Sequence, residues 1–239
     1  METCCPRWFQ INITALTLGE LRRASGGGLG FWFCLPFHLL SRLAGRPWLA
    51  DDLVPEQITI VEQPDDELPV PEPLAALGFV PLLTLSLPEF SGRNLIQMLR
   101  DDSGETVCEF MVAWSEAASG WVKAEIVLAS GLENGELLRT IASPQAYPTL
   151  PPPGHHVVLA RGLRPEALYA RHREELAALA ACEGSSPIVF DAVRSIEVAM
   201  RSHRDLVSYQ VERGVFVEAA PDRVEALLRG KGISRACEG

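Results

Sequence analysis

The feature that most constrains the fold is a run of short apolar segments, separated by turn-forming residues, in the middle of the chain. Each segment has the length and the alternating pattern of a β-strand. The segments are 82–87, 94–101, 105–114, 120–129 and 136–143, and 156–160 adds a sixth. Because the connections are short, the pattern predicts an antiparallel meander of about five to six strands, spanning about 82–160.

Alternation is clearest at 105–114, where Cys108, Phe110 and Val112 fall on one face of the strand. A pair of turn-forming residues, Asn134-Gly135, separates the last two strands of the meander. Asn-Gly is the strongest short hairpin signal, because a type I′ turn needs a positive φ at both central residues. We therefore expect a two-residue hairpin at this position.

The last third of the chain has helical periodicity. Pro165 is typical of the first turn of a helix, which we expect to run to about Cys182. A second helix is expected from Ser186, as N-cap, to about Gln210. Its expected apolar face consists of Val189, Val193, Ile196, Met200, His203 and Val207. A last helix is expected from Pro221 to about Leu228.

Strands followed by helices predict an α+β fold, with two or three helices between about 164 and 230 packed on one face of the sheet. The chain has no alternation of strands and helices, which argues against a doubly wound nucleotide-binding fold. We divide the chain into an apolar and aromatic extension (1–48), an acidic, proline-rich connector (49–72) and an α+β domain (73–239). Within the connector we expect one short strand, at 58–62.

The overall charge limits the possible partners. The net charge is −10, so phosphate backbones would repel the chain, and we expect no nucleic-acid partner. The six cysteines form no C-x-x-C pair, which is typical of reduced thiols in a cytoplasmic protein. No phosphate-binding or dinucleotide-binding motif occurs in a suitable context, so no cofactor is expected. The glycine-rich stretch 25–30 is expected to be a flexible joint.

Residues 29–40 form an apolar patch with eight large aliphatic or aromatic side chains, and four arginines lie at its edges: Arg22, Arg23, Arg42 and Arg46. The run is too short to span a bilayer. We expect the patch to pack against protein, either the α+β domain, another protein or a second copy of the chain. The alternative is peripheral attachment of residues 29–40 to the inner membrane.

Several stretches show a resemblance to known chains. Gly78-Phe79, the hairpin at 134–140, the Pro-Pro-Pro-Gly segment at 151–154, and Leu168-Tyr169 with His172 are similar to an uncharacterised bacterial protein family of planctomycete and proteobacterial type. The resemblance covers roughly residues 74–176. The family has no assigned activity, so the resemblance supports the domain boundaries and implies no mechanism. Some members carry a membrane segment before this domain, which favours the membrane alternative for residues 29–40.

Two consecutive histidines, His155 and His156, follow the proline segment. On a strand they point to opposite faces, so they cannot both bind one ion. A zinc site needs three or four protein ligands, and no spacing in the sequence selects a third. We therefore favour a structural role for both histidines and assign no catalytic or metal-binding residue.

The candidate ligand pocket consists of His156, Tyr169, His172 and Arg173. Tyr169 and His172 are three residues apart and share one face of the expected helix, with Arg173 beside them. This arrangement could bind a small anion. The simpler interpretation is a half-buried aromatic pair beside a solvated charged face.

Two functions from different classes are consistent with these features. The first is a non-catalytic binding or interaction module. The alternative is a hydrolase-type enzyme that uses His156 or His172 as a base or a metal ligand. Because the chain has no G-x-S-x-G or H-E-x-x-H motif, we favour the first.

Overall fold

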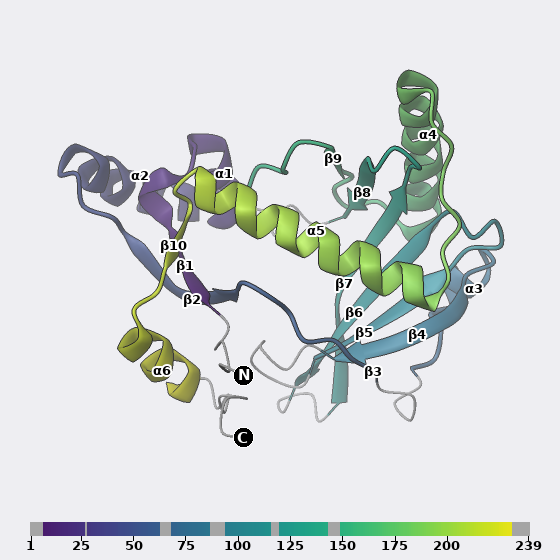
Figure 1. The fold of residues 1–239 in the computed structure, drawn as a ribbon, viewed down its shortest axis with the longest axis horizontal. Helices are drawn as coiled ribbons and strands as arrows, with labels where there is room; N and C mark the ends of the chain where they lie inside the picture. Colours follow the sequence, from purple (N-terminus) through teal and green to yellow (C-terminus); the bar gives the residue numbers. More distant parts are fainter. Residues whose placement is uncertain are drawn as a thin grey trace, which may run out of the picture.

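The computed structural model describes residues 7–26, 28–62, 68–86, 94–115, 120–142 and 149–230. It contains two sheets joined by one long helix (Figure 1). The larger sheet has seven strands in the order β3-β4-β5-β6-β7-β8-β9. Their bounds are Val61–Glu62 (β3), Val80–Ser86 (β4), Asn94–Arg100 (β5), Val107–Ser115 (β6), Gly120–Gly131 (β7), Leu137–Ile141 (β8) and His155–Leu159 (β9).

Strands β3 to β8 pair antiparallel in sequence order, which confirms the predicted meander. Strand β9 is the exception, because it pairs with β8 in parallel. A parallel pair needs a crossover connection, which here lies between Ile141 and His155. The backbone of Leu150, within this connection, bonds to the side chains of Glu20 and Gln210.

The hairpin between β7 and β8 differs from the expected two-residue turn. Leu132 and Glu136 pair through their backbones, so three residues, Glu133, Asn134 and Gly135, form the loop. The N–H of Gly135 donates to the carbonyl of Leu132, and Gly135 has φ +96°. A turn followed by a glycine of positive φ is the usual three-residue hairpin. The prediction placed the turn one residue too late.

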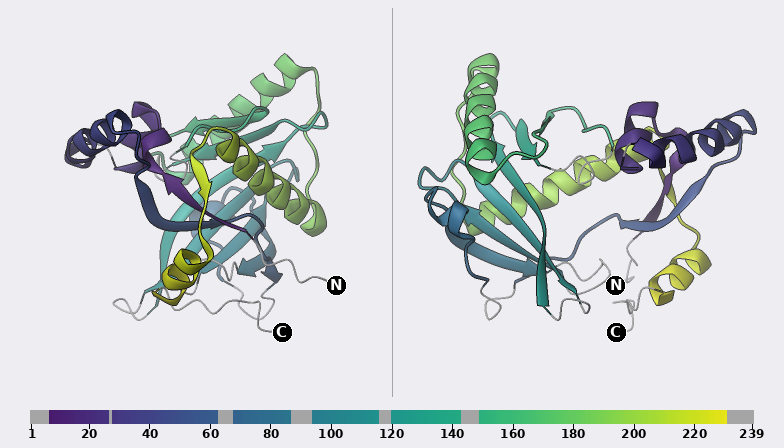
Figure 2. Two further views of the ribbon diagram at one scale, coloured as in Figure 1. Left: turned by 60° about the vertical axis from the view of Figure 1, so that its left-hand side comes forward. Right: turned by 180° about the vertical axis from the view of Figure 1, so that it is seen from behind.

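The helices confirm the α+β class. They cover both faces of the large sheet, whereas we expected helices on one face only (Figures 1 and 2). The short helix α3 (Glu72–Ala75) and the long helix α4 (Pro165–Glu183) cover one face. There Leu74 and Leu168 pack with Leu99, Cys108 and Leu128. Helix α5 (Ala192–Glu212) covers the other face. Because strand side chains alternate, Met98, Val107 and Val127 point to α5 and pack with Val198 and Leu206.

Helix α5 begins at Ala192, with Asp191 as its N-cap, and the expected start at Ser186-Pro187 is wrong. Residues 186–190 run beside the sheet, where Ile188 and Phe190 are buried and donate backbone hydrogen bonds to Gly131 and Gly104. Burial of these two side chains holds the segment extended. Consequently Val189 and Val193 of the expected apolar face point to solvent.

The smaller sheet joins the two ends of the chain. Its central strand β1 (Trp8–Asn12) pairs antiparallel with β2 (Leu49–Pro55) and with β10 (Phe216–Glu218). The last helix, α6 (Pro221–Gly230), packs Val224 and Leu228 against Trp8. Strand β2 lies in the segment that was expected to be a connector with one short strand. Its pairing with β1 was not foreseen because the partner strand is distant in sequence.

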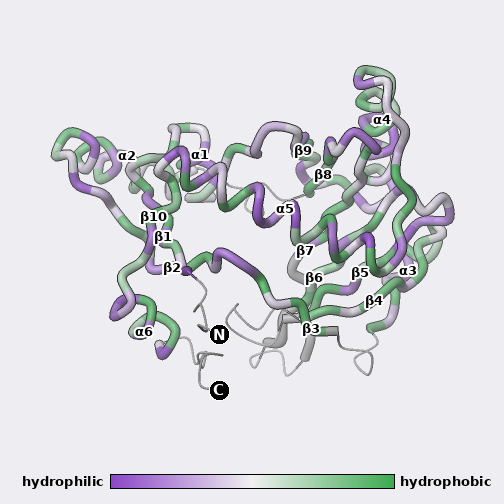
Figure 3. Tube along the Cα trace, in the orientation of Figure 1, coloured by the Kyte–Doolittle hydropathy of each residue, from purple (hydrophilic) through white to green (hydrophobic). Residues whose placement is uncertain are grey.

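Between β1 and β2 the chain forms a short 3-10 helix (Ile13–Ala15), α1 (Leu18–Ala24) and α2 (Gly28–Leu43). Helix α2 begins inside the glycine-rich stretch that was expected to be only a joint, and it continues through Pro36. Figure 3 places α2 at one end of the molecule, far from α4 and the large sheet.

A buried ion pair fastens this end to α5. Glu20 of α1 is fully buried and accepts from both terminal nitrogens of Arg213, at 2.7 and 2.8 Å. It also accepts from the backbone N–H groups of Thr17 and Leu150. Burial alone would raise the pKa of Glu20, but these hydrogen bonds lower it to about 2.

Candidate functional site

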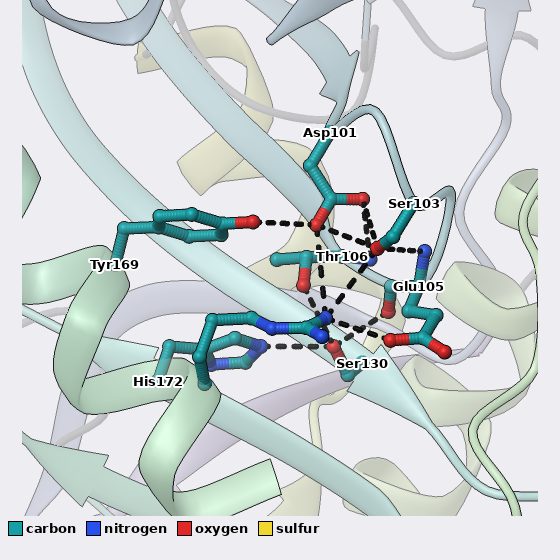
Figure 4. A network of polar contacts seen from close by, with 8 residues as sticks. Asp101, Ser103, Glu105, Thr106, Ser130, Tyr169 and His172 are labelled. Atoms are coloured by element: carbon teal, nitrogen blue, oxygen red, sulfur yellow. Dashed lines mark hydrogen bonds and ion pairs between the residues drawn. The ribbon is translucent and has the colours of Figure 1, made fainter. Parts of the chain in front are cut away.

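The most connected polar cluster surrounds Asp101, at the turn between β5 and β6 (Figure 4). Its carboxylate is buried and accepts from the hydroxyl of Tyr169 at 2.8 Å, the hydroxyl of Ser103 at 3.0 Å and the backbone N–H of Thr106 at 3.2 Å. Burial and the bond to Asp101 raise the pKa of Tyr169 to about 12. The contacts attach helix α4 to the turn.

His172 lies one helical turn after Tyr169 and is fully buried. Its two ring nitrogens contact the hydroxyls of Ser130 on β7 and Thr140 on β8, each at 2.9 Å. Burial, reinforced by the charge of Arg173, lowers the pKa of His172 to about 4, so the ring is neutral at pH 7. With both nitrogens bonded and no exposed surface, His172 has no atom left for a substrate or a metal.

Arg173 completes the cluster at its outer edge. Its guanidinium donates to Glu105 at 2.8 Å and lies 3.8 Å from the carboxylate of Asp101. Three of the four residues of the candidate pocket therefore come together, as expected. Their hydrogen bonds to residues of the sheet and of the β5–β6 turn hold α4 on the sheet. We refer to this hydrogen-bonded cluster as the structural clamp.

His156, the fourth candidate, lies elsewhere. Its Nε2 is 2.7 Å from a carboxylate oxygen of Glu136, which immediately precedes β8, and its side chain is exposed. His155 points to the opposite face, where its Nε2 lies 3.3 Å from Asp205 of α5. The expectation that the two histidines face opposite sides is confirmed. Among the described residues no group of three potential metal ligands gathers at either histidine or elsewhere.

A groove of about 170 Å³ lies under α5, on the face of the sheet that α4 does not cover. Its walls include Ile58, Ile96 and Leu206, and an ion pair at 3.2 Å joins Glu109 to Arg139 within it. Both charged groups are therefore already compensated. The groove has apolar walls and no uncompensated charge to orient a ligand.

Within the described part of the chain, large exposed apolar side chains gather on the outward face of α2. At about 100° per residue, eight of its side chains fall within an arc of roughly 160°, and no polar residue interrupts that arc. They are Leu29, Trp32, Phe33, Pro36, Phe37, Leu39, Leu40 and Leu43. Leu29 is 89% exposed, Leu43 86% and Phe33 72%. Of the three protein surfaces on which the patch was expected to pack, the α+β domain is excluded, since these side chains point away from it.

The inward side of α2 carries a buried histidine. His38 is fully buried, and its Nδ1 lies 3.0 Å from the carbonyl oxygen of Ile13. The helix is thus attached to the protein through a histidine, and its apolar side faces outward. An ordinary surface helix turns its apolar side to the core and its polar side to solvent. Phe37 is close to Trp48, with ring centroids 6.1 Å apart. Contiguous exposed apolar surface is common at protein–protein and membrane interaction sites.

Comparisons of the chain with models of protein families, with curated proteins and with solved structures found no match.

Sequence reasoning missed the acceptor at the centre of the clamp. Asp101 precedes Ser103-Gly104, and an aspartate before a turn commonly bonds to the turn backbone, so this role was readable. Thr17 and Glu20 likewise have the spacing of a capping box, which the structure contains. Ser130 and Thr140 gave no signal, because small polar residues within strands are common.

Proposed function

We propose that the protein is a non-catalytic interaction module and that the outward face of α2 is its binding element. The observation that carries the proposal is the continuous exposed apolar face of this helix. The polar cluster around Asp101, by contrast, is already hydrogen-bonded within the protein. The rest of the fold then has a supporting role. The small sheet, His38 and the pair Glu20–Arg213 hold α2 in place at one end of the molecule.

The energetics of the exposed face support this proposal. Burial of a large apolar side chain contributes about 1.5 to 3 kcal/mol. Seven large side chains of α2 are more than one-third exposed, so covering even half of them would contribute several kcal/mol. A partner that covers this face therefore has a substantial source of binding free energy, before the entropic cost of association.

The non-catalytic part of the proposal is supported by the state of the histidines. A hydrolase that uses His172 would need access to a ring with no exposed surface and two bonded nitrogens. His156 is accessible, and its Nε2 is already engaged with the carboxylate of Glu136 at 2.7 Å. We propose no cofactor. Hydrolysis of a chromogenic ester or phosphate ester that is lost in a His156→Ala variant would overturn this part.

We also propose a cytoplasmic location, on the basis of the cysteine pattern. Among the described residues, no helix is both long enough and apolar enough to cross a membrane. The sixteen residues of α2 also include Arg42 and His38.

The test is to compare three versions of the full chain: wild type, Trp32→Gln/Phe33→Gln, and the control Val193→Gln. Val193 is 67% exposed on α5, so the control also removes an exposed apolar side chain. Binding of 8-anilinonaphthalene-1-sulfonate and of detergent micelles would be measured together with the oligomeric state.

Wild type and the Val193→Gln control should bind both probes or self-associate. The Trp32→Gln/Phe33→Gln variant should bind the probes and self-associate much less, and its melting temperature should equal that of the wild type. Equal behaviour of all three versions would contradict the proposal, because α2 would then contribute nothing to apolar binding.

A further inference from the structure

We infer that the partner of α2 is the surface of an anionic bilayer, on which the helix lies flat with its apolar face among the acyl chains. The inference rests on the proposed function, since it names what the same helix binds. It follows from the distribution of charge around α2, from the geometry of the helix and from the poor fit of a second copy.

Charge is strongly segregated along the sequence around α2. Residues 21–50 contain four arginines and no lysine, aspartate or glutamate, which is a charge of +4. Since the whole chain carries −10, the other 209 residues together carry −14. The apolar helix therefore lies in a stretch of thirty residues that has four positive charges and no acidic residue. A positive charge of this kind attracts anionic headgroups.

Two of the arginines lie at the C-terminal end of α2, and the other two lie in the preceding helix. Arg42 lies in the last turn of α2 and Arg46 follows it, and both are exposed. Arg22 and Arg23 lie in the last turn of the neighbouring helix α1. An interfacial helix buries its apolar face to the depth of the headgroup boundary while basic side chains at its margins remain among the phosphates.

The helix geometry also suits an interface and not a crossing. Sixteen residues extend about 24 Å, which is shorter than the roughly 30 Å of a hydrocarbon core. Trp32 and Trp48 are of the residue type that prefers the headgroup level. The buried attachment through His38 fixes the opposite side of the helix to the protein, so α2 can enter only one leaflet.

A second copy of the chain fits this surface less well. Pairing two α2 helices would bring two sets of four arginines together, and the 21–50 segments contain no carboxylate to offset them. Like charges brought together at an interface oppose association. An anionic bilayer supplies the complementary charge and the apolar environment together.

The experiment is flotation of the full chain with vesicles of phosphatidylcholine alone or of phosphatidylcholine with phosphatidylglycerol. Phe33→Glu tests the apolar face, and Arg42→Gln/Arg46→Gln tests the charge. The matched controls are Val193→Glu on α5 and Arg161→Gln/Arg171→Gln, whose side chains are exposed at the other end of the protein. Circular dichroism and thermal melting verify that each variant is folded.

Wild type and both controls should float with the anionic vesicles and not with the neutral ones, and raised salt should release them. The arginine variant should bind about tenfold or more weakly, since each basic residue near an anionic surface strengthens binding roughly fivefold. Phe33→Glu should abolish flotation. Brominated lipid should quench tryptophan fluorescence in the wild type, and Trp32→Phe should remove most of that quenching.

Three results would overturn the inference. Equal binding to neutral and anionic vesicles would remove the role of charge. Flotation unaffected by Phe33→Glu would place the contact elsewhere. Absence of flotation, together with a dimer that Phe33→Glu dissociates and Val193→Glu does not, would identify a second copy as the partner. That last result would leave the proposed interaction module intact. If the wild type bound neither detergent micelles nor the dye and did not self-associate, the proposed module would be refuted as well.

Discussion

The hydroxyl of Tyr169 donates a 2.8 Å hydrogen bond to the buried carboxylate of Asp101, which lies 68 residues earlier in the chain. This contact joins the first turns of α4 to the β5–β6 turn. Because Asp101 is charged and almost without exposure, each of its hydrogen bonds should contribute more to stability than an ordinary surface contact.

Replacement of Tyr169 by phenylalanine should therefore destabilise the protein. A hydrogen bond to a buried charged group contributes about 1.5 to 3 kcal/mol, and the ring itself, which packs edge-on against Phe79, is retained. Chemical denaturation would measure the change. The same substitution at half-buried Tyr209, whose ring lies beside the guanidinium of Arg213, is the control and should cost much less. Equal losses of stability in the Tyr169→Phe and Tyr209→Phe variants would show that the other hydrogen bonds of Asp101 suffice without Tyr169.

His172 should make the stability depend on pH in the weakly acidic range. Its pKa falls from an ordinary 6.5 to about 4 in the folded protein, mainly because of burial. The unfolded chain therefore binds this proton more readily, and acidification from 6.5 towards 4 favours unfolding. Denaturation at a series of pH values would reveal the slope.

A His172→Ala variant should be less stable at pH 7 by about 2 to 5 kcal/mol, because it leaves a cavity and two hydroxyls without their partner. Its stability should also change less between pH 6.5 and 4 than that of the wild type. His156→Ala, at an exposed position, serves as the control and should keep the wild-type slope. An unaltered slope in the His172→Ala variant would assign the pH dependence to another group.

The buried pair Glu20–Arg213 predicts a second, more acidic transition. The carboxyl has a pKa of about 2 when folded and 4.5 ordinarily, so its contribution to stability is present above 4.5 and is lost as the pH falls towards 2. Arg213→Ala would leave Glu20 buried without its cation, at a cost of about 3 to 5 kcal/mol.

The control for Arg213→Ala is Arg171→Ala, which removes an exposed arginine paired with Glu174 and Glu175 on the surface of α4. Exposed pairs contribute less than about 1 kcal/mol. Urea titrations at pH 7 and pH 3 would separate the two variants. A loss at Arg213 no larger than at Arg171 would mean that the pair does not secure α1 to α5.

The double variant His155→Ala/His156→Ala should leave metal content at background. The two side chains point to opposite faces and contact Asp205 and Glu136 respectively, so no common ion can contact both. Elemental analysis of purified protein would test this. A stoichiometric ion present in the wild type and lost in the double variant would show that one of the histidines is a ligand.

Much of the large sheet could be predicted because its determinants are local. The alternation in β6 and β7, the short turns between strands and Pro165 at the start of α4 each act over a few residues. For the same reason the α+β class and the opposite orientation of His155 and His156 were predictable. The errors arose where a distant contact competes with a local signal. Ser186-Pro187 resembles a helix start, but burial of Ile188 and Phe190 against the sheet keeps that segment extended.

By itself, the sequence determined the elements of the meander, the long helices and the existence of an apolar segment bordered by arginines. The tertiary structure decided how those elements are used. It paired β1 with strands from both ends of the chain, placed β9 parallel to β8, enclosed His172 and Asp101 in one clamp, and turned the apolar side of α2 outward. Local patterns are set by backbone sterics and side-chain periodicity, whereas these arrangements depend on contacts between residues far apart in the chain, whose free energy no local pattern encodes.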